Sequence, residues 1–328
     1  MASEFDLIAR HFTRPARTAA LGSGDDCAPL GIGDDCALVE APAGLVLAVT
    51  TDMLLEGTHF LPGADAKQLG HKSLAVNLSD LAAMGADPRW FLLALSLPDA
   101  DEAWLAAFAA GMFALADANA IELIGGDTTR GPRSICITAI GTLPPGCALR
   151  RDTASVGEDL WLSGSTGDAA LGLAHRKGQA KLDADAAAHC LARLDAPAPR
   201  VALGTKLRGI AGSAIDVSDG LLADVGHVVE QSKVAADVEY ETLPRSAALR
   251  SCADPALADE CLLAGGDDYE LVFTAPAARR AEVAAAGQAA GVAVTRIGSI
   301  VGGESKVTLI DAQRRPITVG RRGFDHFR

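Results

Sequence analysis

The chain has 328 residues, enough for two domains of ordinary size, and hydrophobic residues make up 49% of it. Aromatic residues make up only 4%, so alanine and leucine must supply most of the core packing. The formal net charge of −13 argues against nucleic acid as a partner, because duplex binding needs a basic surface. The same charge would repel an anionic nucleotide, so if this chain handles phosphates we expect it to use Mg²⁺.

The N-terminal sequence is acidic and has no apolar segment typical of a signal peptide, and no run approaches the length of a membrane helix. We therefore expect no membrane partner. The seven cysteines include no Cys-x-x-Cys pair, which argues against both a disulfide framework and a zinc site. A reducing cytoplasm is the expected location.

Hydrophobic periodicity in the first half of the chain predicts helices that alternate with strands. A Pro-Pro-Gly sequence after Leu143 ends this part of the chain. The expected elements are a helix over 3–12, a strand over 45–52, a helix over 67–84, a strand over 90–97, a helix over 103–119, a strand beginning at 121–124 and a strand over 134–143.

A second unit is expected to begin near Arg151, and it also alternates strands with helices. The pattern predicts two α/β domains, residues 1–150 and residues 151–328. The elements expected in the second domain are a strand at 159–163, helices entered at Asp168 and at Leu221, helices over 185–194, 200–211 and 277–290, and a strand over much of 292–300.

Aspartates recur beside glycine or hydroxyl residues at several separate places in the chain. Any one such motif is typical of an ordinary turn between strands. Their repetition instead favours a site for hard cations, which take carboxylate oxygens and share them with substrate phosphates. The motifs are Gly33-Asp34-Asp35, Thr50-Thr51-Asp52, Asn77-Leu78-Ser79-Asp80, Gly125-Gly126-Asp127 and Asp216-Val217-Ser218-Asp219.

The segment Gly22–Ala28 nearly duplicates Gly31–Ala37 and carries its own pair, Asp25 and Asp26. A proline follows the first copy, whereas the second runs directly into strand-like residues, so we interpret the second as the functional one. The chain has no Walker-type phosphate loop and no protein-kinase signature set. A nucleotide must therefore be bound in another way.

Taken together, six ordered motifs strongly resemble those of the thiamine-monophosphate kinase family. The resemblance extends from about residue 4 to His326, and the order of the motifs makes a chance match very unlikely. The motifs are Gly31-Ile32-Gly33-Asp34-Asp35, Thr50-Thr51-Asp52, the segment Asn77–Pro88, Gly125-Gly126-Asp127-Thr128, Asp216-Val217-Ser218-Asp219-Gly220 and Gly265-Gly266-Asp267-Asp268-Tyr269-Glu270.

The resemblance implies an α/β (α+β) fold of two domains. An N-terminal domain of sheet and helices, residues 1–150, would bind ATP and Mg²⁺ and dimerise through its sheet. A C-terminal α/β domain would follow over 151–328, with the active-site cleft between the two. The superfamily implied is that of the ATP-using aminoimidazole ribonucleotide and selenophosphate synthetases.

Carried over position by position, the resemblance also implies the roles of individual residues. The residues implied to bind Mg²⁺ are Asp35, Thr50, Thr51, Asp52, Asp80, Asp127, Asp216 and Asp219. Those implied to contact ATP are Gly126, Asp127, Arg151 and Ser218. Those implied to contact thiamine monophosphate are His59, Asp267 and Phe324.

Two of these positions depart from the family's pattern. The family commonly has Glu where Asp267 stands, so that contact is expected to be shorter or relayed by water. A polar-tipped aromatic is common where Phe324 stands, so ring stacking should persist while a polar contact is lost. On sequence alone a C-terminal phenylalanine is also typical of a core residue.

The implied reaction is ATP-dependent phosphorylation of thiamine monophosphate to thiamine diphosphate, the final step of thiamine diphosphate biosynthesis, by in-line transfer in a homodimer with several Mg²⁺ ions. No catalytic general base is named, because the attacking phosphate is already ionised near neutral pH. One alternative is a sister synthetase, although the Cys and Lys pair of selenophosphate synthetase is missing. A second is a non-catalytic module that binds divalent metal ions.

Overall fold

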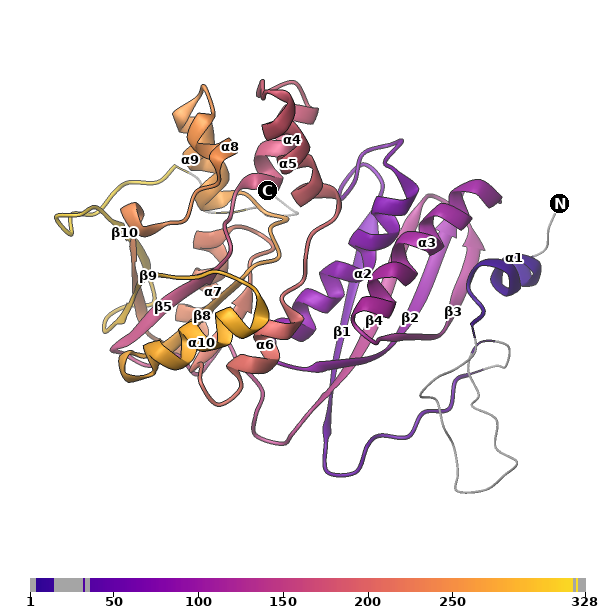
Figure 1. Cartoon of the computed structure of the whole chain (residues 1–328), viewed down its shortest axis with the longest axis horizontal. Helices are drawn as coiled ribbons and strands as arrows, with labels where there is room; N and C mark the ends of the chain where they lie inside the picture. The colour runs from indigo at the N-terminus through magenta and orange to yellow at the C-terminus, as the bar shows by residue number, and fades with distance from the viewer. Residues whose placement is uncertain (1–3, 15–31, 33–35, 321–322, 324–328) are drawn as a thin grey trace. The chain divides into compact units, whose positions relative to one another are not determined.

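The computed structural model describes residues 4–14, 32, 36–320 and 323. Asp35 and Phe324, both expected in the site, lie outside the described residues. The chain divides into two compact units: an N-terminal unit of Met1–Leu81 and Ala86–Gly146, and a C-terminal unit of Ala82–Gly85 and Cys147–Arg328 (Figure 1). In the described part of the chain, no helix is both long and apolar enough to cross a membrane.

The N-terminal unit is built on a four-stranded sheet with the order β1-β4-β2-β3. Strand β4 pairs antiparallel with both β1 and β2, whereas β2 and β3 run parallel, so β1 and β3 form the two edges. The elements are α1 (Glu4–His11), β1 (Val46–Leu55), α2 (Ala66–Ala83), β2 (Asp87–Leu97), α3 (Glu102–Ala118), β3 (Glu122–Arg130) and β4 (Ser134–Leu143).

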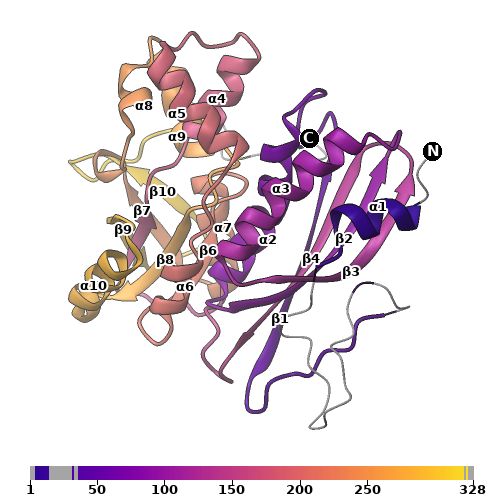
Figure 2. The same cartoon turned by 45° about the vertical axis from the view of Figure 1, so that its right-hand side comes forward.

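Helices α2 and α3 lie side by side over one face of this sheet (Figure 2). Two glycines allow the helices to approach closely, because a Cβ at Gly70 would overlap the carbonyl oxygen of Phe108. A Cβ at Gly111 would likewise overlap the carbonyl oxygen of Lys67. The backbones of α2 and α3 are therefore in direct contact at these two positions.

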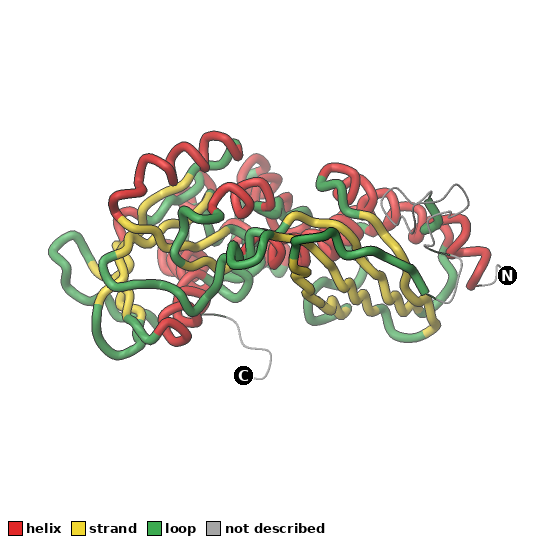
Figure 3. The backbone as a smooth tube through the Cα atoms, turned by 90° about the horizontal axis from the view of Figure 1, so that it is seen from below, coloured by secondary structure: helices red, strands yellow, loops and turns green. Residues whose placement is uncertain are grey.

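The other face of the sheet is not covered by helices of this unit, which lie on one side of the strands (Figure 3). Along β1, side chains alternate between the two faces. Leu47, Val49 and Met53 are exposed at 47%, 62% and 53%, which is unusual for large apolar side chains in a sheet. The edge strand β1 thus presents an apolar surface, which we call the β1 surface: Val46, Leu47, Val49 and Met53.

The C-terminal unit contains a six-stranded mixed sheet with the order β10-β7-β9-β5-β8-β6. Its strands are β5 (Glu158–Ser163), β6 (Ser213–Asp216), β7 (Ala235–Glu239), β8 (Leu271–Pro276), β9 (Val294–Val301) and β10 (Val307–Ile310). Its helices are α4 (Asp168–Arg176), α5 (Ala184–Asp195), α6 (Val201–Leu207), α7 (Leu221–Ser232), α8 (Ala247–Ser251), α9 (Pro255–Ala264) and α10 (Arg280–Ala290), with short 3₁₀ turns at Tyr240–Thr242 and Ala277–Arg279.

Both faces of this second sheet are buried. In β5, Leu160 and Leu162 belong to one apolar cluster together with residues of α7, whereas Trp161 belongs to another with residues of α6 and α10. Since neighbouring side chains of a strand point to opposite faces, the two clusters lie on opposite sides of the sheet. Burial on both faces explains why β5 and β8 read as nearly continuous apolar runs.

The mixed α/β architecture with two sheets confirms the expected fold class. Several bounds differ from the expectation. The strand expected to turn at Gly125 continues to Arg130, the helix expected over 200–211 ends at Leu207, and the helix expected from 277 is a 3₁₀ turn until Arg279. Helices α8 and α9 and the short edge strand β10 were not predicted.

The contact between α2 and α3 yields a stability prediction. Gly111→Ala should lower the free energy of unfolding by about 1–3 kcal/mol, because the added methyl group forces the two helices apart. This penalty should outweigh the roughly 1 kcal/mol that alanine gains over glycine in a helix. Thermal or urea unfolding of the variant measures the difference.

The matched control is Gly226→Ala, in the interior of α7, where an added Cβ meets nothing within 4 Å. This change should leave stability the same or raise it. If Gly111→Ala were as stable as Gly226→Ala, close backbone contact would not be what holds α2 against α3.

Candidate active site

In the N-terminal unit, Thr50, Asp52 and Asp80 are brought together on the helix-covered face of the sheet. The hydroxyl of Thr50 in β1 donates a hydrogen bond to the carboxylate of Asp80 in α2. Asp52 stands two residues after Thr50 and therefore points to the same face. Strand β1 and helix α2 thus place two carboxylates and a hydroxyl on one side of the sheet.

Asn77 precedes Asp80 by three residues and lies on the same side of α2. It is fully buried, and its Nδ2 donates to the carbonyl oxygen of Ser73 at 3.2 Å. Its Oδ1 has no hydrogen-bond partner among the described residues. A buried amide oxygen without a donor costs about 1–3 kcal/mol, and a cation or its water shell would satisfy it.

Thr51 and Asp127 are not on the same side of the sheet as Asp52. Thr51 points to the uncovered face, where its hydroxyl pairs with that of Thr138 at 2.8 Å. Asp127 is in register with Ala94, whose neighbours across the sheet lead to Met53 on that same face. The structure therefore does not gather all the aspartates of this unit around one point.

Asp52 and Asp127 are also at opposite edges of the sheet. One row of paired residues runs from Asp52 to Ile137, Leu93 and Gly126. Three steps between strands separate the ends of this row, or about 14 Å at the usual strand spacing. Ligands of one Mg²⁺ ion lie about 2.1 Å from it, so one ion cannot contact both carboxylates within one chain.

Gly126 and His59 lie near the edges of this sheet. Gly126 has φ +153, and a Cβ there would overlap the carbonyl oxygen of Leu93, so only glycine fits between the paired strands. His59 is in the turn after β1, and its Nδ1 accepts a hydrogen bond from the backbone N–H of Leu55 at 3.0 Å. That bond leaves the other ring nitrogen, Nε2, as the one directed away from the strand backbone.

In the C-terminal unit, the loop after β6 is wrapped around a buried carboxylate. Asp224, in the first turn of α7, is 2% exposed. Its Oδ2 accepts hydrogen bonds from three consecutive backbone N–H groups, those of Ser218, Asp219 and Gly220, each at 3.1 Å. Burial, reinforced by the charges of Asp216 and Asp219, raises the pKa of Asp224 to about 8.

The sequence analysis missed Asp224 and His227. Together with Asp219, each offers a potential ligand atom within 4.8 Å of the other two. The spacing in α7 contained the signal, because residues three apart on a helix share a face. The aspartate oxygens suit Mg²⁺, whereas an imidazole is more typical of zinc or another transition metal. The donor set therefore fits Mg²⁺ through its carboxylates.

Asp267 lies directly beside Ser218. The backbone N–H of Asp267 donates to the carbonyl oxygen of Ser218 at 2.9 Å, and the hydroxyl of Tyr269 donates to Asp267 Oδ1 at 3.0 Å. Asp267 has φ +69, a left-handed conformation that few residues other than glycine adopt. This unit thus brings together Asp216, Ser218, Asp219 and Asp267.

Arg151 is not close to that group within the C-terminal unit. The hydroxyl of Ser232, the last residue of α7, donates to the carbonyl oxygen of Arg151 at 2.8 Å. Ser218 precedes the other end of α7, a helix of 12 residues or about 18 Å. The Arg151 side chain is exposed, and no ion pair of it is found among the described residues.

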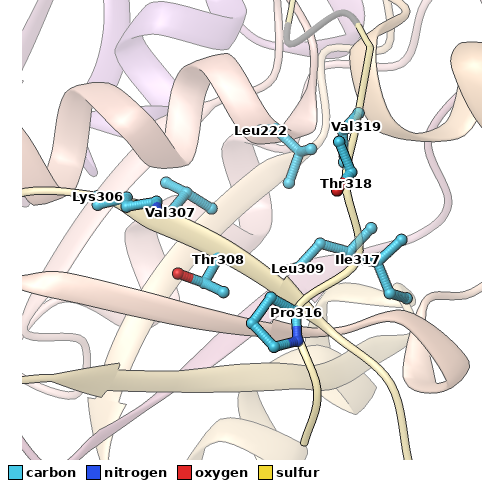
Figure 4. A pocket seen from close by; sticks show the side chains of 9 residues that line it. All are labelled: Leu222, Lys306, Val307, Thr308, Leu309, Pro316, Ile317, Thr318 and Val319. Atoms are coloured by element: carbon cyan, nitrogen blue, oxygen red, sulfur yellow. The ribbon is translucent and has the colours of Figure 1, made fainter.

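A cavity of about 230 Å³ also lies in this unit, between the start of α7 and strand β10 (Figure 4). Leu222, in the first turn of α7, contributes one wall, and apolar residues of β10 and of the segment after it contribute most of the rest. No carboxylate lines the cavity, so it is distinct from the acidic loop at Ser218 and Asp219.

Comparison with known families matches most of the chain. Residues 33–143 match the model of the AIR synthase related protein, N-terminal domain, and residues 155–310 match the corresponding C-terminal domain. Among solved structures, a thiamine-monophosphate kinase from Stenotrophomonas maltophilia has 51% sequence identity and a TM-score of 0.80. The match covers 85% of this chain and 90% of that one.

A second solved structure, a complex named AaThiL with AMPPCP and TMP, has 28% identity and a TM-score of 0.74, covering 90% of this chain and 92% of that one. The thiamine-monophosphate kinase of Escherichia coli is 45% identical over 328 residues, or 99% of this chain and 98% of the relative. With both domain models matched and near-complete coverage by curated relatives, the chain belongs to the AIR synthase related family, and within it to the thiamine-monophosphate kinases.

Proposed function

We propose that this protein transfers the γ-phosphoryl group of ATP to thiamine monophosphate, giving thiamine diphosphate and ADP. The carrying observation is that a chain 45% identical to a thiamine-monophosphate kinase over its whole length gathers its predicted site residues into two compact groups. These are Thr50, Asp52 and Asp80 in one unit, and Asp216, Ser218, Asp219 and Asp267 in the other. A relative's complex with an ATP analogue and TMP supports both substrates.

The chemistry of this reaction is mainly a problem of charge. The acceptor is a phosphate monoester whose second pKa is about 6, so its oxygen is already ionised at neutral pH and needs no general base. Donor and acceptor both carry negative charge, and the protein must hold them together in line. Positioning and neutralisation are therefore the tasks of the site.

We propose that Mg²⁺ supplies the neutralisation. Asp52 and Asp80 with Thr50, and separately Asp216 and Asp219, present the hard oxygen ligands that this ion takes. When bound, Mg²⁺ would bridge phosphate oxygens and lower the repulsion between the two substrates. The remaining proposed metal ligands are Asp35, Thr51 and Asp127.

The proposed substrate contacts follow the family resemblance. Gly126, Asp127, Arg151 and Ser218 are assigned to ATP, and His59, Asp267 and Phe324 to thiamine monophosphate. A planar guanidinium such as that of Arg151 can hold two phosphate oxygens at once, which orients a nucleotide better than a point charge. In the same proposal, residues 1–150 bind ATP and Mg²⁺ and dimerise, and residues 151–328 form the second domain, in a cytoplasmic enzyme.

We further propose that the protein is a homodimer joined through the β1 surface. Contiguous exposed apolar side chains on an edge strand mark an interaction site, because they otherwise promote uncontrolled association. The separation of Asp52 from Asp127 supports the same assembly. If both carboxylates serve one active site, a second copy of the chain must bring its Asp127 to the first copy's Asp52.

The first prediction concerns the reaction itself. The purified protein should release ADP from ATP when thiamine monophosphate is added, and form thiamine diphosphate in equal amount. Thiamine without its phosphate, and aminoimidazole precursors, are the controls. Turnover of an aminoimidazole substrate without turnover of thiamine monophosphate would assign the chain to a sister synthetase instead.

The second prediction concerns the metal. Activity should continue to rise with Mg²⁺ after all ATP is present as MgATP, because the two carboxylate groups exceed what one ion requires. The measurement is initial rate against free Mg²⁺ at constant MgATP. A rate that saturates at one equivalent of Mg²⁺ per ATP would contradict a site with several ions.

The third prediction concerns the dimer. Asp52→Asn and Asp127→Asn should each lower kcat on the order of 100-fold, because an amide cannot balance a divalent ion. Unfolding and refolding the two variants together should restore about a quarter of wild-type activity. Half of randomly paired dimers are hybrids, and each hybrid has one intact site of two.

Each variant refolded by itself is the control and should remain inactive. If the mixture were as inactive as the separate variants, the two aspartates would not be shared between copies. A protein that sediments as a monomer at assay concentration would overturn the dimer while leaving the proposed reaction in place.

A further inference from the structure

The turn Gly265–Glu270, between α9 and β8, is held in a costly conformation. Asp267 has φ +69 and Tyr269 has φ +51, so two non-glycine residues, one position apart, occupy the left-handed region. Each such residue costs on the order of 1–3 kcal/mol and persists only where the surrounding structure enforces it. The contacts of this turn identify what enforces it.

Part of the support is a backbone ladder to the loop that follows β6. Tyr269 N–H donates to the carbonyl oxygen of Val217 at 2.8 Å, and Val217 N–H donates to that of Glu270 at 2.8 Å. Asp267 N–H continues the ladder to Ser218. Any shift of the turn would therefore also move Ser218 and its neighbour Asp219.

Beyond the ladder, the strongest anchor is the carboxylate of Glu270, whose side chain is 1% exposed. Arg193 of α5 donates to it at 2.7 Å, and Arg200 donates with Nε at 2.6 Å and also with Nη2. Ser163, at the end of β5, donates its hydroxyl at 2.5 Å. One carboxylate thus joins three separate parts of the chain to the end of the turn.

The surroundings of Glu270 are shaped for a carboxylate. Gly164 has φ +54, and a Cβ there would overlap the Glu270 side chain, so glycine leaves the space that the carboxylate occupies. Ser163 Oγ also accepts from the backbone N–H of Leu271 at 2.8 Å. Arg193 reaches past Glu270 to the carbonyl oxygen of Asp268 at 3.3 Å, which fixes the middle of the turn as well.

Asp268 ties the middle of the turn to a further element. Its side chain is 1% exposed, and its Oδ2 accepts from the backbone N–H of Gly167 at 2.7 Å. Asp268 and Glu270 therefore point inward on either side of Tyr269. Asp267 is held at the outer end of the turn, beside Ser218, with the Tyr269 hydroxyl on its carboxylate.

We propose that Glu270, bound by Arg193 and Arg200, is a positioning residue that fixes Asp267 and Ser218 for substrate binding. This inference rests on the proposed function, in which Asp267 contacts thiamine monophosphate and Ser218 contacts ATP. Glu270 itself touches neither residue through its side chain. It acts by holding the strained turn in its one register on Val217 and Ser218.

The test is Glu270→Gln, which keeps the size of the side chain but leaves two arginines beside a neutral amide. It should lower kcat/KM for thiamine monophosphate about 10–100-fold, because a small misplacement of a positioning group costs that much. Some loss of stability is also expected, since one partner of a buried ion pair is removed.

A matched control separates positioning from stability. Asp159 in β5 is also a buried carboxylate held by two arginines, Arg280 at 2.6 Å and Arg296 at 2.8 Å. The hydrogen bond from Arg280 is the main cause that holds the pKa of Asp159 below its ordinary value. Asp159→Asn should lower the thermal midpoint as Glu270→Gln does, yet leave kcat/KM within about two-fold, because it does not touch the turn.

A spectroscopic readout reports on the turn directly. The chain has 2 tyrosines, Tyr240 and Tyr269, so protein labelled with fluorotyrosine gives two ¹⁹F resonances, and Tyr240→Phe assigns the one from Tyr269. In Glu270→Gln the Tyr269 resonance should shift or broaden at temperatures far below unfolding. In Asp159→Asn it should stay unchanged.

Equal losses of activity in Glu270→Gln and Asp159→Asn, in proportion to their loss of stability, would reduce Glu270 to a structural role. An unchanged Tyr269 resonance in Glu270→Gln would overturn the proposal in the same way. If Glu270→Gln does not fold, Arg200→Lys keeps the charge but loses the two-pronged contact, and a smaller change of the same kind is expected.

The two proposals can fail separately. Wild-type protein without thiamine-monophosphate kinase activity would refute the proposed function. The Tyr269 resonance would still decide whether Glu270 holds the turn, because it requires no substrate.

Discussion

The repulsion between carboxylates that the fold brings close together is the constraint on which both halves of the site depend. Thr50 and Asp52 are presented toward Asp80 by a strand and a helix, and Asp216 and Asp219 surround the buried Asp224. Backbone N–H groups compensate Asp224, but they do not neutralise the whole group. A site of this kind is costly without cations and well suited to hold them beside phosphates.

Local patterns were sufficient to predict most elements of the fold. The strand expected over 134–143 is β4 with the same bounds, and the helix expected over 67–84 is α2 within one residue. The failures were at places where local preference and tertiary pairing disagree. The Gly-Gly-Asp motif at 125–127 is typical of a turn, yet it remains in β3 because Leu92, Leu93 and Ala94 of β2 pair with it residue by residue.

The arrangement of the candidate site was harder to predict, because it depends on the order of strands. Alternation along β1 already implied that Thr51 points away from Asp52. The separation of Asp52 from Asp127 required knowing that β1 and β3 are opposite edges of one sheet. Likewise, no local pattern connects Ser163, Arg193 and Arg200 to Glu270, because their contacts span 70 to 107 residues of sequence.

The C-terminal unit treats its carboxylates in two different ways. Glu270 and Asp159 are each held by two arginines, so their charge is compensated within the chain. Asp219, in contrast, has no ion pair with lysine or arginine among the described residues, although Arg193 and Arg200 support the turn next to its loop. Arginine therefore stabilises the frame, and the carboxylate that the frame presents is left for a cation from solution.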